Sequence, residues 1–200
     1  MLDAIAALHQ GEVIGLPTET LFGLAADPWH PEAVARLTRL KARPTDKGFI
    51  LLVARQEDLA SLVEPPSPLA RSLMARFWPG PLTLVLPARS GLPDPITGGS
   101  GSVAVRHSPA PAVQELLALW RGPLISTSAN RAGEPPPATS QEVREIWHSE
   151  GMLVLDGTIR PDALPSTLLK ITANRATLLR HGAIPLEQLR SWIPDLEEAV

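Results

Sequence analysis

Two of the three lysines in the chain lie in one short segment, residues 41–47, with an arginine and a proline between them. The chain otherwise carries its positive charge on fifteen arginines. Lysine presents a compact charge with three donors, whereas the planar guanidinium of arginine binds two oxygen atoms at once. Lys41, Arg43 and Lys47 together therefore predict a site for a polyanion such as a nucleotide phosphate chain. The alternative interpretation is a solvated loop after an amphipathic helix, because charged runs usually lie on the surface.

Hydroxyl, amide and cationic side chains also stand where other apolar stretches end. They are Thr18, Thr20, Arg106, Ser126, Ser128, Asn130, Ser166 and Arg180. Such groups suit phosphoryl or nucleotidyl transfer, in which the enzyme positions the reactants and neutralises growing negative charge without forming a covalent bond. Each also has a structural explanation, since Thr18 can satisfy a turn and Ser128 or Asn130 can cap a helix. The 126–130 run is interpreted equally well as a turn or as a ligand site.

Motifs of other familiar chemistries are absent from the sequence. There is no Gly-x-x-x-x-Gly-Lys-Ser/Thr phosphate loop and no complete Gly-x-Gly-x-x-Gly. The chain has no cysteine, which excludes disulfides, thiolate catalysis and cysteine-ligated metals. The five histidines have no metal-ligand spacing, so we predict no metal held by protein side chains.

The elements that must position these residues alternate between helical and extended patterns. Periodicity predicts helices at residues 2–8, 31–41, 68–77, 111–120 and 185–192. Apolar runs predict strands at residues 12–16, 49–53, 82–86, 103–106, 124–125, 152–155, 166–171 and 176–179, with a loop after residue 17. Ligands of open α/β sheets gather outside the carboxyl ends of strands, so we expect the candidate residues to meet there.

Length and charge limit the class of protein further. A chain of 200 residues fits a single domain, 1–200, with room for a core and a cleft. The formal net charge of −3 argues against a general nucleic-acid coat, so any basic site must be local. The N-terminus lacks a basic region before an apolar core, and no apolar run approaches the ~18 residues of a membrane span. We therefore expect a cytoplasmic protein with no membrane partner.

Five short motifs carry a resemblance to a known family. They are Leu-Pro-Thr-Glu-Thr-Leu-Phe-Gly-Leu at 16–24, Lys-x-Arg-Pro at 41–44, Phe-Trp-Pro-Gly-Pro-Leu-Thr at 77–83, Val-Arg at 105–106 and Ser-Thr-Ser-Ala-Asn at 126–130. In this order and spacing, the chain resembles the short bacterial form of the TsaC/YrdC family of threonylcarbamoyl-AMP synthases over nearly its whole length. The resemblance implies a single α/β domain, in which a twisted open mixed sheet is flanked by helices and carries a basic concave cleft.

The resemblance also implies an activity. Enzymes of this family are nucleotidyltransferases that combine L-threonine, bicarbonate and ATP into L-threonylcarbamoyladenylate and pyrophosphate. A downstream tRNA threonylcarbamoyl transferase complex then uses the product to modify the adenosine next to the anticodon. Magnesium is expected to arrive with ATP, without assigned protein ligands, and Glu19 and Asp46 are the nearest candidate carboxylates.

Residue roles follow from the resemblance in four groups. The catalytic residues that hold the ATP phosphates and the carbamate are Lys41, Arg43 and Lys47. The residues that contact the nucleotide are Ser126, Ser128 and Asn130. Those near the threonine substrate are Thr18 and Thr20, with Arg106 on its carboxylate. Those that close the far side over the adenylate are Ser166 and Arg180.

Two alternatives stay open from the sequence. The first is an RNA-binding module that contacts tRNA or double-stranded RNA without catalysis, although the net charge of −3 disfavours the many phosphate contacts this needs. The second is a related domain that acts on carbamoyl phosphate in hydrogenase-maturation proteins. The sequence disfavours this second alternative, because the chain has neither the acylphosphatase-like segment nor the zinc-finger cysteines found beside that domain.

Overall fold

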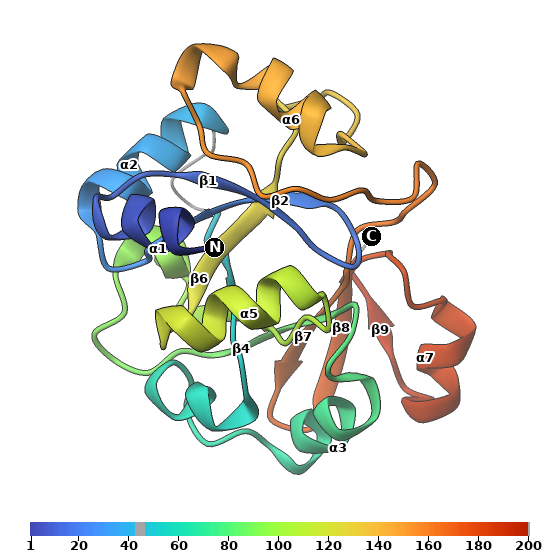
Figure 1. The fold of residues 1–200 in the computed structure, drawn as a ribbon. Coiled ribbons are helices and arrows are strands. Elements are labelled where there is room, and N and C mark those ends of the chain that lie inside the picture. The colour runs from blue at the N-terminus through green and yellow to red at the C-terminus, as the bar shows by residue number, and fades with distance from the viewer. Residues whose placement is uncertain (43–46, 200) are drawn as a thin grey trace.

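The computed structural model describes residues 1–42 and 47–199, so the candidate Arg43 lies outside the described residues. Within these ranges, one mixed sheet has the strand order β1-β2-β6-β3-β5-β4-β7-β8-β9 (Figure 1). The pairs β3–β5, β4–β7 and β8–β9 are parallel and the other neighbours are antiparallel. The strands are β1 (Ile14–Pro17), β2 (Phe22–Ala26), β3 (Ile50–Leu52), β4 (Leu82–Pro87), β5 (Ser102–Arg106), β6 (Leu124–Ser128), β7 (Thr167–Thr172), β8 (Arg175–Arg180) and β9 (Glu197–Glu198).

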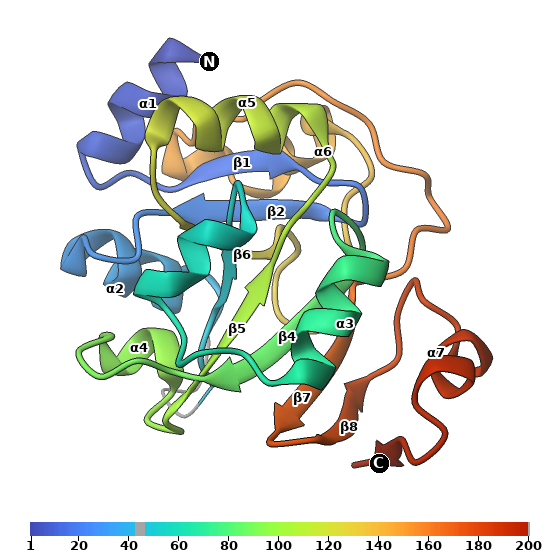
Figure 2. The same ribbon diagram turned by 90° about the horizontal axis from the view of Figure 1, so that it is seen from below.

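Helices flank the sheet, which confirms the predicted fold class. Three of them begin with proline, whose missing N–H is not needed in the first helical turn. In Figure 2, α1 and α5 lie side by side against β1, and α3 lies near β4. The α-helices are α1 (Leu2–His9), α2 (Pro31–Leu40), α3 (Pro68–Phe77), α4 (Asp94–Thr97), α5 (Pro111–Trp120), α6 (Ser140–Ile146) and α7 (Leu186–Trp192), and the 3₁₀ helices are η1 (Gln56–Ser61) and η2 (His148–Glu150). None of the helices in the described parts of the chain has the length and apolar character needed to cross a bilayer.

One face of the sheet is buried throughout its centre. This face carries one fully buried residue from each central strand: Leu24 on β2, Leu51 on β3, Val105 on β5 and Ile125 on β6. They belong to the main hydrophobic core, to which α2 and α3 also contribute. Successive residues of a strand point to opposite faces, so the residues between them face the other way. Each strand residue therefore faces either the main core or the opposite side of the sheet.

The opposite face is divided into a covered half and an open half. Ala25, Leu52 and Leu124 pack into a second core under α1 and α5. On the same face, Ile50, two residues before Leu52, and Ser126, two residues after Leu124, stay partly exposed. The open half of this face therefore provides the floor of a cleft.

The structure differs from the prediction at three strand positions, and α4, α6, β9 and the two 3₁₀ helices were not predicted. β2 occupies Phe22–Ala26, where the sequence predicts a loop, because burial on both faces overrides the weak strand preference of glycine and alanine. β6 continues to Ser128, so the predicted strand 124–125 is too short and part of the predicted polar turn is strand. Residues 152–155 form no strand, and Val154 makes only an isolated parallel bridge to Gly15.

Candidate functional site

A cleft of about 980 Å³ lies over the open half of the sheet. The candidate residues Thr18, Thr20, Lys41, Lys47, Arg106, Ser126, Ser128, Asn130, Ser166 and Arg180 all line this cleft. They come from the β1–β2 turn, the residue after α2, the segments before β3 and β7, strands β5, β6 and β8, and the segment after β6. Residues far apart in the sequence are thus brought to one cavity, whose size suits a ligand such as a nucleotide.

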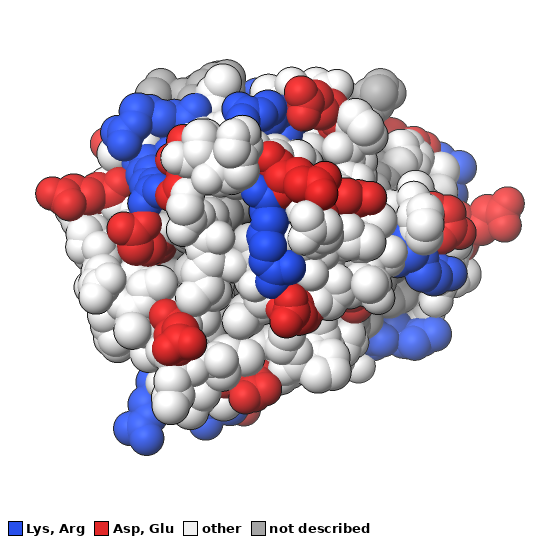
Figure 3. Space-filling model, turned by 45° about the horizontal axis from the view of Figure 1, so that its top comes forward, with Lys and Arg blue, Asp and Glu red and all other residues white. Residues whose placement is uncertain are grey.

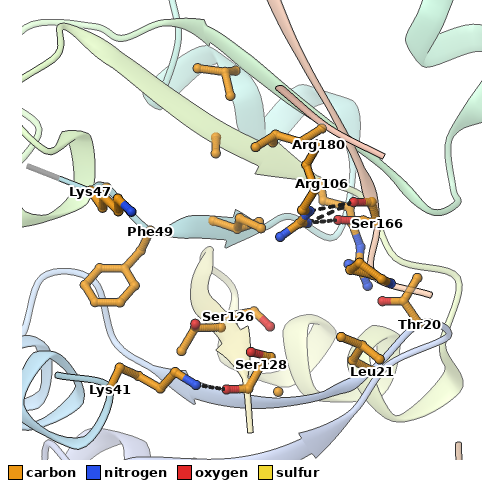
Figure 4. Close-up of a pocket in the computed structure, with 18 of the residues that line it drawn as sticks. Thr20, Leu21, Lys41, Lys47, Phe49, Arg106, Ser126, Ser128, Ser166 and Arg180 are labelled. Carbon is orange, nitrogen blue, oxygen red and sulfur yellow. Dashed lines mark hydrogen bonds between the residues drawn. The ribbon is translucent and has the colours of Figure 1, made fainter. Parts of the chain in front are cut away.

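The charged residues on the cleft wall have one sign. Lys41, Lys47, Arg106 and Arg180 contribute to it, and no aspartate or glutamate does among the residues that the structure describes. In Figure 4, the two lysines lie on one side of the view and Arg106 and Arg180 on the other. A cavity walled by cations on opposite sides concentrates positive potential, which attracts anionic substrates.

Lys41 is fixed in place at the base of this wall. The residue directly follows α2 and is buried, and its Nζ donates to the carbonyl oxygens of Ser128, at 2.8 Å, and Asn130. Backbone carbonyls orient an ammonium group but do not neutralise its charge. Lys41 thus lines the cleft with a fixed ammonium, and its side chain also joins α2 to the end of β6.

The β1–β2 turn is organised by Thr18. Its Oγ1 accepts hydrogen bonds from the amides of Thr20 and Leu21, both at 3.2 Å, and lies 3.0 Å from the Thr20 hydroxyl. Thr18 Oγ1 also donates to the carbonyl oxygen of Leu21 at 2.6 Å. Thr18 thus fulfils the turn-satisfying alternative while it lines the cleft, and Thr20 is presented beside it.

Small residues keep the floor of the cleft open. A Cβ atom on Gly23 would lie 2.7 Å from Ser126 Oγ on the neighbouring strand β6. Real Cβ atoms do not approach so closely, so the glycine makes room for the hydroxyl of Ser126. Ser128 is paired with Gly23 across the strands and faces the same way.

Side-chain hydrogen bonds hold the chain after β6 in place. Asn130 Nδ2 donates to the carbonyls of Arg131 and Glu134, at 2.8 and 2.7 Å, which fixes the orientation of the amide. Trp147 Nε1 donates to the carbonyl of Ala129 at 2.7 Å. Asn130 Oδ1 is buried and accepts no hydrogen bond from the residues that the structure describes.

Arg106 is a buried cation in the wall of the cleft. Its Nη2 lies 3.1 Å from Glu19 Oε2, and only 7% of its side chain is exposed. Burial lowers the pKa of the Arg106 guanidinium, while the charge of Glu19 and their hydrogen bond act in the opposite direction. Arginine keeps its charge even so, because its ordinary pKa is far above neutrality.

Ser166 and Arg180 form a connected unit at the far wall. Arg180 Nη2 donates to the carbonyl of Ser166 at 2.8 Å and to its hydroxyl at 3.1 Å. The hydroxyl of Ser166 also lies 2.7 Å from Thr83 Oγ1, inside the protein. A Cβ on Gly182 would meet the Pro165 carbonyl oxygen at 2.4 Å, so this glycine allows the close approach of the two segments.

Sequence reasoning missed the apolar and small residues of the cleft. Phe49, Ile50, Val85 and Ala104 line it beside the polar candidates. Ile50, Ala104 and Val85 are aligned on neighbouring strands and face the open side. Alternation of small and apolar residues within the predicted strands is the signal that could have located them, once the strand order was known.

Carboxylates are not gathered for a metal ion in the described part of the chain. No group of three or more histidine, cysteine, aspartate or glutamate residues is arranged to hold one there. Glu19 already accepts hydrogen bonds from Arg106 and Ser108, and Asp46 lies outside the described residues. A magnesium ion that keeps its waters and leans on ligand phosphates is compatible with this site, since it needs few protein ligands.

Comparison with known sequences places this architecture in a family. The family model of the Sua5/YciO/YrdC group, described as "Telomere recombination", matches residues 6–182. The chain is 42% identical over 165 residues to a threonylcarbamoyl-AMP synthase of Pseudomonas aeruginosa, covering 82% of this chain and 89% of that protein. It is 35% identical over 193 residues to a threonylcarbamoyl-AMP synthase of Pyrococcus abyssi, covering 96% of this chain.

The relatives differ in how much of their length is matched. This chain spans 57% of the P. abyssi protein. The crystal structure of P. abyssi Sua5 complexed with L-threonine superposes with a TM-score of 0.92 at 35% identity, over 98% of this chain and 58% of that one. With both the family model and these relatives matched over most of its length, the chain belongs to the Sua5/YciO/YrdC family.

Proposed function

We propose that this protein is a threonylcarbamoyl-AMP synthase, a nucleotidyltransferase that combines L-threonine, bicarbonate and ATP into L-threonylcarbamoyladenylate and pyrophosphate. The relatives from P. aeruginosa and P. abyssi carry that name, and the P. abyssi Sua5 structure is of a complex with L-threonine. The observation that carries the proposal is the convergence of Lys41, Lys47, Arg106 and Arg180 on one cleft.

The reaction requires two anions to meet. The amine of threonine and bicarbonate give a carbamate and water. A carbamate oxygen then forms a bond to the α-phosphorus of ATP, while the bond from that phosphorus to the bridging oxygen breaks and pyrophosphate leaves with the electron pair. Fixed cations lower the barrier because they offset the repulsion between carbamate and phosphates and stabilise the charge that develops.

Lys41 and Lys47 are the proposed contacts for the ATP phosphates and the carbamate. Lys41 is held by two backbone carbonyls, so its ammonium needs little reorganisation when an anion binds. Ser126, Ser128 and Asn130, which line the cleft beside Lys41, are proposed to contact the nucleotide. The proposed phosphate contact by Arg43 stays a prediction, since that residue is outside the described range.

The threonine end of the site is proposed at the β1–β2 turn. Thr18 and Thr20 line the cleft there, and Arg106, joined to the same turn through Glu19, would bind the substrate carboxylate. Ser166 and Arg180 would close the opposite wall over the adenylate. Magnesium would enter as the ATP complex and lower the negative charge of the phosphates.

The product would need an acceptor. Threonylcarbamoyladenylate is a mixed anhydride, which is reactive toward water and amines, so a rapid transfer step must follow its synthesis. We propose that a downstream tRNA threonylcarbamoyl transferase complex consumes it to modify tRNA, in the cytoplasm. Direct contact between this protein and tRNA would make that transfer efficient and is a separate proposal.

An RNA-binding module without catalysis is less well supported. On the face drawn in Figure 3, lysine and arginine side chains are interspersed with aspartate and glutamate. Non-specific RNA binding instead requires many phosphate contacts along a continuous basic surface. The cations of the cleft are enclosed with small polar groups, an arrangement that suits a small ligand better than a polymer.

Pyrophosphate release from ATP tests the proposal. Release is expected to require both L-threonine and bicarbonate, and glycine and serine serve as control amino acids. Salt provides a second criterion, since RNA affinity falls steeply with ionic strength while turnover of ATP changes less. A folded protein without threonine-dependent release would contradict the proposed activity.

A further inference from the structure

The ion pair between Arg106 and Glu19 lies behind the wall of the cleft. Arg106 lines the cavity, whereas Glu19 does not, although its neighbours Thr18 and Thr20 do. Only 19% of the Glu19 side chain is exposed. The carboxylate of Glu19 thus meets the guanidinium of Arg106 from the protein side and leaves the cleft side of Arg106 to a ligand.

A third residue fixes the carboxylate. Ser108 is fully buried, and its hydroxyl donates to the same Glu19 Oε2 that receives Arg106 Nη2. The Ser108 hydroxyl in turn accepts a hydrogen bond at 3.2 Å from the amide of Ala110, the residue before α5. Glu19 is therefore held from two directions, by a cation and by a hydroxyl anchored at the start of a helix.

Two buried atoms of this cluster have no hydrogen-bond partner among the residues that the structure describes. They are Arg106 Nε, a donor, and Glu19 Oε1, an acceptor. Nε and Nη2 form one edge of the guanidinium, and the two carboxylate oxygens can receive both of their N–H groups side by side. A small movement of either side chain would let Arg106 Nε donate to Glu19 Oε1 while Nη2 donates to Oε2, which would satisfy both atoms. The outer edge of the guanidinium, formed by Nη1 and Nη2, would then stay directed at the cleft.

We propose that Glu19, anchored by Ser108, is a positioning residue that fixes the guanidinium plane of Arg106 so that its outer edge receives the carboxylate of the amino-acid substrate. This inference rests on the proposed function. It adds a role for Glu19, which acts through Arg106 and does not touch the substrate. It also assigns a purpose to Ser108, which holds the positioning residue.

A competing role for Glu19 has the opposite consequence. If its carboxylate instead competed with the substrate carboxylate for Arg106, removal of Glu19 would strengthen threonine binding. In a positioning role, removal lets the buried guanidinium turn away, and threonine binding weakens. The sign of the change in KM for L-threonine therefore distinguishes the two roles.

The test compares Glu19→Ala, Ser108→Ala and the control Glu12→Ala by pyrophosphate release at saturating ATP. Glu12 pairs with Arg36 and neither residue lines the cleft, so the control removes a carboxylate from an ion pair elsewhere. Loss of a charge-assisted contact predicts a rise of roughly ten- to hundredfold in KM for L-threonine with Glu19→Ala, and a smaller rise with Ser108→Ala. The KM for ATP is expected to stay within about twofold, a separation that general loss of structure would not give.

A double-variant cycle with Arg106→Ala tests whether Glu19 acts through Arg106. The expected result is that Glu19→Ala has no additional effect on kcat/KM for threonine once Arg106 is gone. Glu19→Gln, which keeps the size of the side chain, replaces Glu19→Ala if that variant does not fold. An unchanged or lowered KM for threonine, or additive losses in the double variant, would overturn the inference. Wild-type protein without threonine-dependent release would instead contradict the proposed function itself.

Discussion

Replacement of Lys41 by methionine isolates the charge of the cleft lysine. The substitution keeps most of the side-chain length but removes the ammonium that donates to the carbonyls of Ser128 and Asn130. Each partly buried carbonyl that loses its donor costs up to about 1–3 kcal/mol, while the cost of burying an ammonium is also removed, so we expect a net loss of about 1–3 kcal/mol in the free energy of unfolding.

The effect on turnover should be larger than the effect on stability. Removal of one fixed donor that stabilises transition-state charge lowers kcat roughly 10²- to 10³-fold in comparable sites. We therefore expect Lys41→Met to lose adenylate formation at a temperature where urea unfolding shows that the variant remains folded. The two losses arise from one side chain because Lys41 both joins α2 to β6 and lines the cleft.

The chain offers a matched control for this experiment. Lys170 is exposed on β7 outside the cleft, so Lys170→Met makes the same change in residue type and in net charge. The assay is pyrophosphate release with L-threonine and bicarbonate, together with urea unfolding of both variants. If folded Lys41→Met turned over ATP as fast as Lys170→Met, the assignment of Lys41 to the chemistry would be refuted.

Three further predictions address the floor, the far wall and the pH response. Gly23→Ala should raise the KM for ATP several-fold, because its Cβ would displace the Ser126 hydroxyl, whereas Gly122→Ala, with ordinary contacts, serves as the kinetic control. Thr83→Val should reduce the free energy of unfolding by about 1–2 kcal/mol in urea, because it removes the buried partner of the Ser166 hydroxyl. Burial lowers the pKa of His107 below its ordinary value of 6.5, so the unfolded chain binds the proton first and stability should fall as pH drops below 6.5. Urea midpoints measured against pH should show a smaller fall in His107→Gln, and equal slopes would contradict this assignment.

The residue types of the site were predictable because their chemistry is local. Hydroxyls and cations at strand ends indicated the cleft, and each of those within the described range lines it. The prediction that these residues meet at the carboxyl ends of the strands was wrong, however. β6 runs antiparallel to β3, and β3 is parallel to β5, so the carboxyl ends of β5 and β6 point in opposite directions. The residues meet because helices cover only half of one sheet face.

The partners of the site residues were less accessible to sequence reasoning. Glu19 and Ser108 are 89 positions apart, and no local pattern indicates that they share a hydrogen bond. β2 was missed because its glycine and alanines have little intrinsic strand preference and the strand depends on its neighbours. The helix α6 did have a local signal, since Thr139 and Glu142 form a capping box at its start.

Direct detection of the product is the most decisive measurement on this protein. Purified protein would be incubated with ATP, L-threonine and ¹³C-bicarbonate, and the nucleotides analysed by mass spectrometry. The account predicts L-threonylcarbamoyladenylate that carries the bicarbonate carbon, formed with pyrophosphate and absent when threonine is omitted. Folded protein that gives no labelled adenylate, or that releases pyrophosphate without threonine, would contradict the proposed synthase activity.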